Sequence, residues 1–194
     1  MSCVSVGTNN QESMLMQNRT IFRLTRALTK LLSAGLLLSL ATFTATAADS
    51  ALQVALNTSK AAPRVMEPLT ERSILRDFTF AWESMTRALA SNTTGPLNGI
   101  FDGNARAFLN DTIHGQQKSG LTSHYGNQSH KVDAVFYSPE GDLLELHDTA
   151  EYDLEIHDGS KTIDSQHVIA HYVVLMTPGA DRWVVRQLQA VPQF

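Results

Sequence analysis

The alternation of apolar and polar residues is clearest from Leu143 to His157, where it predicts a β-strand. Alternate residues form one apolar row, and the residues between them are mostly polar or charged. This period of two is typical of a strand with one face buried and the other in water. One residue breaks the apolar row, because Asp148 places a carboxylate in it. The strand ends at Asp158-Gly159, a dipeptide that favours a tight hairpin turn.

Upstream of this strand the apolar residues recur at spacings of three and four, which predicts helices. Residues 70–91 carry a wide apolar stripe with Trp82 at its centre, and Gly95-Pro96 stops this helix. A second helix is expected from Asp102 to one of the glycines that follow. We expect the stripe of 70–91 to face the core of the domain rather than a cofactor or a partner.

Four strands with tight turns between them are predicted downstream, at 131–137, 143–157, 162–176 and 183–191. Tight turns make neighbouring strands antiparallel, so the sheet is expected to be a four-stranded meander. N-terminal helices packed on such a sheet define an α+β domain. The third strand is apolar on both faces towards its end, as in a strand inside a sheet or beneath a dimer partner.

The N-terminal residues 1–47 have the three-part pattern of a secretory signal peptide. A positive segment (19–30) precedes an apolar run (31–40), and the small-x-small sequence Ala45-Thr46-Ala47 precedes Ala48. We therefore expect cleavage at Ala47/Ala48 and a periplasmic or secreted mature protein. An uncleaved membrane anchor is the alternative, although an apolar run of this length is short for a membrane span.

The expected organisation is a signal peptide at 1–47, with 1–13 an over-extended start, then a linker (48–69), the folded domain (70–191) and a tail (192–194). Cleavage would remove the only cysteine, Cys3, and with it any disulfide or thiolate metal site. The leader holds four of the fifteen basic and one of the nineteen acidic residues, which leaves eleven and eighteen, a net charge of −7. This balance argues against nucleic acid as a partner.

The chain resembles the nuclear transport factor 2-like superfamily over residues 70–191. The features that carry the resemblance are the helix with Trp82, the Phe101-Asp-Gly103 start of the next helix, the hairpin at Asp158-Gly159 and the final Asp181-Arg-Trp183-Val-Val pattern. The resemblance implies a curved sheet wrapped around the helices as a cone, often with an internal pocket, and frequent homodimers through the outer sheet face. The meander order most resembles the branch with periplasmic assembly factors of secretion systems and organelle-division scaffolds.

A two-residue turn at Asp158-Gly159 would place Asp148 opposite Ile169, with His167 and His171 on the same inner face. Limonene-epoxide hydrolases of this superfamily use an Asp-Arg-Asp set, of which Asp148 and Arg186 would supply a part. The expected ligand pocket is therefore lined by Asp148, Tyr152, His167, His171 and Arg186.

Asp148 is the candidate catalytic residue, with His171 as its proton partner. Burial raises the pKa of a carboxylate, and a nearby imidazole suits acid–base chemistry. Alternatively, Asp148 bonds to a histidine or a backbone N–H and is simply satisfied in the core, or a bulge turns it outward. Helix 70–91 has no tyrosine, so the constellation of ketosteroid isomerases is absent.

The histidines do not predict a metal site, and no cofactor motif is present. His167 and His171 are four residues apart, which separates them by roughly 13 Å along a strand. The acidic face of 143–157 would either bind a partner or be solvated, and we favour a solvated face.

Three functions follow from these patterns. The first is an exported, non-enzymatic domain that binds a partner protein or a small ligand through the pocket or the sheet face. The second is a small isomerase, dehydratase or cyclase that uses Asp148 with a histidine. The third is a membrane-tethered subunit of an envelope assembly. The enzyme requires a ligand-sized cavity at Asp148 with His167 or His171 in reach.

Overall fold

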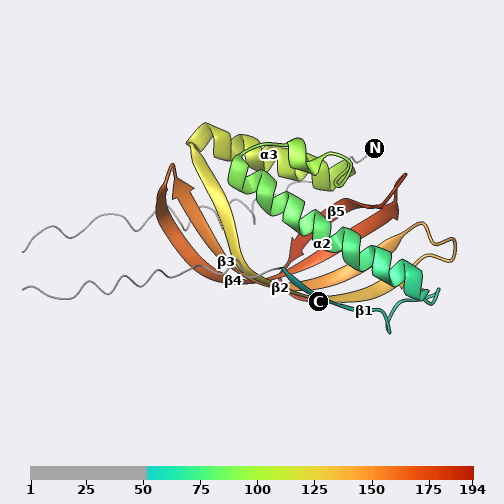
Figure 1. Ribbon diagram of the computed structural model, residues 1–194. Helices are drawn as coiled ribbons and strands as arrows, with labels where there is room; N and C mark the ends of the chain where they lie inside the picture. The colour runs from blue at the N-terminus through green and yellow to red at the C-terminus, as the bar shows by residue number, and fades with distance from the viewer. Residues whose placement is uncertain (1–51) are drawn as a thin grey trace, which may run out of the picture. The chain divides into compact units, whose positions relative to one another are not determined.

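The computed structural model describes residues 52–194, which form an α+β domain (Figure 1). Its elements are β1 (Gln53–Asn57), α2 (Pro68–Ser91), the 3₁₀ helix η1 (Gly95–Leu97), α3 (Gly103–Ser119), β2 (Leu121–Tyr137), β3 (Leu144–Asp158), β4 (Lys161–Pro178) and β5 (Trp183–Val191). The signal peptide expected at 1–47 lies outside the described residues.

One mixed sheet contains all five strands in the order β1-β2-β3-β4-β5. The strands β2 to β5 form the predicted antiparallel meander, and β1 pairs with β2 in parallel. Figure 1 shows the sheet curving around α2 and α3, which lie on its concave face. The opposite face of the sheet is not covered by a helix of the described residues.

The sequence-based prediction of four strands is wrong by one strand. The fifth, β1, lies inside the expected linker 48–69, and the two helices therefore follow a strand instead of beginning the domain. Its five residues carry only two apolar side chains that point towards the core, Val54 and Leu56. Two apolar positions are too few to establish a period, so this strand could not be predicted from its own sequence.

The second strand is also longer than predicted, since β2 begins at Leu121 and not near residue 131. Gly120 ends α3 with a φ of 71°, a left-handed conformation that glycine adopts without strain, and the chain enters β2 directly. The first ten residues of β2 are mostly polar and contain a bulge between Gly126 and Ser129. The bulge interrupts the alternation on which the prediction depended.

The core lies between α2 and the concave face of the sheet. Trp82 lies in the middle of the predicted helix stripe and is 3% exposed, in agreement with the pattern. Its indole packs edge-on against Phe78 at 6.4 Å and Tyr172 at 5.4 Å between ring centroids. The other large, fully buried apolar side chains come from both helices, from η1 and from the sheet: Ile74, Leu97, Leu109, Ile113, Leu144, Leu146, Val174 and Met176.

No helix within residues 52–194 has the length and apolar character needed to cross a membrane.

Replacement of Trp82 by alanine is expected to reduce the free energy of unfolding by about 3–5 kcal/mol, the range for removal of a large buried aromatic side chain. Denaturant unfolding measures this loss. Leu69→Ala is the matched control on the same helix, because Leu69 is 72% exposed and its removal is expected to cost less than about 0.5 kcal/mol. A loss below about 1 kcal/mol for Trp82→Ala would contradict the packing described here.

Candidate functional site

The histidine that meets Asp148 is His130 on β2, and not His167 or His171. The His130 Nδ1 and Asp148 Oδ2 atoms are 2.9 Å apart, and both side chains are 0% exposed. A side chain with no accessible surface has no room for even a water-sized molecule against it. The pair is therefore sealed inside the domain.

The local geometry of β2 and β3 produces this pair. Asp148 lies opposite Val132 in the antiparallel register, and His130 lies two residues away on the same inner face of β2. Helix α2 covers the pair from above, with Trp82 at 4.4 Å and Phe78 at 5.9 Å from the imidazole centroid. The two polar side chains are thus enclosed by aromatic rings.

The electrostatics of Asp148 follow from its burial. Loss of solvation raises the pKa of this carboxyl above its ordinary value, and the hydrogen bond with His130 opposes the increase. Its second oxygen, Oδ1, has no hydrogen-bond partner among the described residues, nor do His130 Nε2 and the buried Ser84 Oγ on α2. With no accessible surface on either side chain of the pair, this arrangement offers no path for a substrate.

Two tyrosines form a second polar pair on the inner face of the sheet, beside Asp148. The hydroxyls of Tyr152 and Tyr172 are 3.1 Å apart, and burial raises the pKa of both phenols. Tyr152 lies on the inner face of β3, as predicted for the candidate pocket, and Tyr172 lies directly opposite Asp148 on β4. Within the described residues neither hydroxyl is hydrogen bonded to Asp148, and the two phenols bond to each other.

The predicted register of the β3–β4 hairpin is wrong. The turn residues are Gly159 and Ser160, because Asp158 still pairs with Lys161, and a bulge follows at Ile156 and His157. Together these two features shift the register by three residues relative to the expected one. A shift by an odd number of residues moves the β4 side chains from Asp164 onward to the opposite face of the sheet.

His171 and His167 are therefore on the outer face of the sheet, away from the expected inner pocket. The Nδ1 atom of His171 is 3.2 Å from the Thr149 hydroxyl. His167 lies between Asp153, at 2.9 Å, and Glu151, at 3.2 Å. The hydrogen bond with Asp153 raises the pKa of His167 above its ordinary value.

Arg186 also lies outside the expected pocket. It is the extra residue of a bulge in β5, between residues paired with Leu175 and Met176. Its guanidinium donates to Thr177 and forms an ion pair with Asp102, the residue that caps α3. Arg186 therefore links the edge strand β5 to the start of α3 through an exposed ion pair.

A cavity of about 10 Å³ lies between α2 and the sheet, and its lining is apolar: Phe78, Ala81, Trp82, Met85, Phe101, Val174, Val185 and Leu188. This volume is at the lower limit for a single water molecule. None of the five residues predicted to line a pocket contacts this cavity. The structure thus does not bring those five side chains together.

His130 is the residue that sequence analysis missed, and a signal for it was present. His130, Val132 and Ala134 alternate on one face of β2, so extension of the predicted strand by one residue would have placed an imidazole on the buried side. A buried carboxylate needs such a hydrogen-bond partner.

The outer face of β3 carries acidic side chains in contact with histidines. His147 Nε2 is 3.0 Å from Glu145 Oε1, and His157 Nε2 is 2.9 Å from Glu155 Oε2. His124 on β2 stacks on His157 with 4.1 Å between ring centroids. Within residues 52–194, no group of three or more His, Asp or Glu side chains is arranged to hold a metal ion.

Apolar side chains are exposed beside this acidic row, and we name them the outer-face patch: Ile169, Val173 and Phe194. Ile169 is 63% exposed and Phe194 is 54% exposed. The ring of Phe194 stacks on His147 at 4.3 Å, so the chain terminus lies across the outer face. Val173 on β4 is paired with His147 on β3, and its side chain is partly buried.

Comparison with known proteins identifies similarity in structure alone. No protein-family model matches the chain, and no curated protein matches it in sequence. The fold is similar to the crystal structure of the intermembrane space region of chloroplast protein ARC6, with a TM-score of 0.53 and 14% sequence identity. The match covers 66% of this chain and 98% of the ARC6 chain. Identity this low shows a common fold and nothing more.

The Asp148→Asn variant is expected to remove a specific pH dependence of stability. The raised pKa means that the folded protein binds a proton that the unfolded chain releases above about pH 3.8. The contribution of Asp148 to stability is therefore full below that pH and decreases as the pH rises through the folded-state pKa. The difference in unfolding free energy, wild type minus Asp148→Asn, should decrease over this window.

Urea unfolding of both proteins between pH 3.5 and 7 measures this difference, with Asp111→Asn as an exposed control. A difference that stays constant, or increases with pH, would mean that Asp148 is charged in the folded protein throughout.

Proposed function

We propose that this chain is an exported, non-enzymatic domain that binds a partner protein on the outer face of its sheet. The observation that carries the proposal is the contrast between the two faces. The only buried carboxylate–imidazole pair of the described residues has no accessible surface, which leaves no place for a substrate beside it. The outer face is uncovered and exposes apolar side chains.

The outer-face patch favours a partner with a complementary surface. Ile169 is a large apolar side chain left in water, and such a residue contributes to binding when a partner buries it. Glu151 on β3 lies directly opposite Ile169, and Asp153, two residues further on the same face, adds a second carboxylate. An apolar contact surrounded by lysine or arginine side chains would therefore fit this face.

A second copy of the chain is a less suitable occupant than a basic partner. A second copy would bring the same two carboxylates, Glu151 and Asp153, to the interface, and like charges oppose association. The homodimer implied by the family resemblance remains an outcome that the experiment below detects.

Export and membership of the nuclear transport factor 2-like superfamily belong to the same proposal. The signal-peptide pattern of 1–47 supports export, and the ARC6 region with a similar fold is described as part of an intermembrane space. The sheet that curves around α2 and α3 supports the cone expected for the superfamily (Figure 1). A tethered protein would present the same outer face if the leader stayed attached.

The test places a photo-crosslinking amino acid, p-benzoylphenylalanine, at position 169 of the full chain in the cell of origin. Illumination is expected to give one discrete adduct whose mass exceeds that of the protein by the mass of its partner. Phe108 is the matched control, because it is also an exposed large apolar residue (39%) but belongs to α3 on the concave side.

An adduct of twice the monomer mass would identify a second copy as the occupant and contradict a basic partner. Equal adducts from positions 169 and 108, or none from 169, would contradict binding on the outer face.

A further inference from the structure

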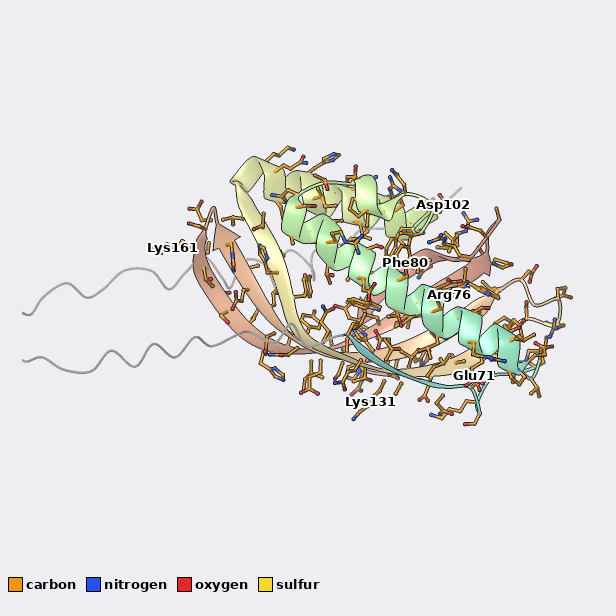
Figure 2. All side chains as sticks on the ribbon, viewed as in Figure 1. Glu71, Arg76, Phe80, Asp102, Lys131 and Lys161 are labelled. Atoms are coloured by element: carbon orange, nitrogen blue, oxygen red, sulfur yellow. The ribbon has the colours of Figure 1, made fainter. Side chains whose placement is uncertain are left out.

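A groove of about 370 Å³ lies between α2 and the β4–β5 turn, remote from the outer-face patch. Its walls are Arg76, Asp77 and Phe80 from α2 and Asp181 and Arg182 from the turn. Figure 2 labels Arg76 and Phe80, which lie one helical turn apart on α2 beside the start of β5. The volume is within the range of small-molecule sites, about 300–1,000 Å³.

Asp77 holds the groove together and is not free to bind a cation. It is 4% exposed, and its Oδ2 accepts the backbone N–H of Trp183 at 2.8 Å. The Nε and Nη2 of Arg76 donate to the same carboxylate at 2.8 and 3.1 Å. Asp77 therefore fixes the turn against the helix and fixes the direction of Arg76.

Arg182 forms the opposite wall and is held by an aromatic ring and an exposed carboxylate. Its guanidinium lies over Phe80, 5.1 Å from the ring centroid. Its Nη2 donates to Asp181 at 3.0 Å, but the Asp181 side chain is 71% exposed. An exposed ion pair of this kind contributes little free energy, so another carboxylate can replace Asp181.

Both guanidiniums keep donors available. Each uses Nε and Nη2 for its aspartate, and within residues 52–194 neither Nη1 donates a hydrogen bond. Both side chains line the same groove. Planar guanidinium groups bind planar carboxylates through paired hydrogen bonds.

We propose that this groove is a binding site for a carboxylate attached to a small aromatic or apolar body. The carboxylate displaces Asp181 from Arg182 and reaches Arg76, and the apolar body packs against the edge of Phe80. Asp181 occupies the place of the ligand carboxylate when the site is free.

The probe for the test is benzoate, with neutral benzamide as its isosteric control, added to the full-length protein. Two-dimensional ¹⁵N NMR of the arginine Nε–H groups follows Arg76 and Arg182. Benzoate is expected to shift both signals in a saturable manner, and benzamide is expected to shift neither.

Three variants test the geometry. Arg182→Ala should reduce the benzoate affinity at least tenfold, and Asp181→Asn should increase it severalfold, because the competing carboxylate is gone. Arg87→Ala on the exposed side of α2 is the matched control and should leave the affinity unchanged.

A capped dipeptide with an aspartate next to a phenylalanine distinguishes the source of the carboxylate. Tighter binding than benzoate indicates an acidic protein segment, and weaker binding indicates a free aromatic acid; both support the site. Equal shifts by benzoate and benzamide, or the same benzoate affinity in wild type and Arg182→Ala, would overturn the proposal. Weaker benzoate binding by Asp181→Asn would also overturn it.

Discussion

The hydrogen bond between His130 and Asp148 is the constraint on which the interior of this domain depends. A buried carboxylate is costly unless it is paired, and its cost increases when the partner is removed. The pair joins β2 to β3 at the point where α2 crosses the concave face, and Trp82 covers the imidazole. The position of the helix, the register of two strands and the direction of one carboxylate are therefore coupled.

The two faces of the sheet differ accordingly. The concave face is filled by aromatic rings, the polar pair and a cavity no larger than a water molecule, which is a packed core and not a ligand pocket. The family resemblance implies an internal pocket, but in residues 52–194 Trp82 and Tyr172 pack together on the inner face beside Asp148. The two binding sites that we propose, the outer-face patch and the groove beside Arg182, both lie outside this core.

Periodicity predicted the elements with long, regular patterns. The helix stripe centred on Trp82, the strand 143–157 and the burial of Asp148 could all be predicted, because each depends on the local period of the sequence. The α+β class followed from the order of these elements.

The partner of Asp148 could not be predicted, because it depends on register. The pattern at Asp158-Gly159 indicates a turn but does not say which two residues form it, and the bulge at Ile156 has no sequence signature. These two local features together transfer His167 and His171 to the outer face of the sheet and leave His130 as the buried imidazole. The short strand β1 was missed for a different reason, since it is held by pairing with β2 and not by a pattern of its own.

A double-mutant cycle on His130 and Asp148 tests the central claim most directly. His130→Leu and Asp148→Leu each leave one polar group buried without its partner, so each is expected to cost about 3–5 kcal/mol of unfolding free energy. The double variant leaves neither group, and we expect it to be no less stable than either single variant, which corresponds to a coupling of at least about 3 kcal/mol. Single losses that add within about 0.5 kcal/mol would show that the two residues act independently and would contradict the account.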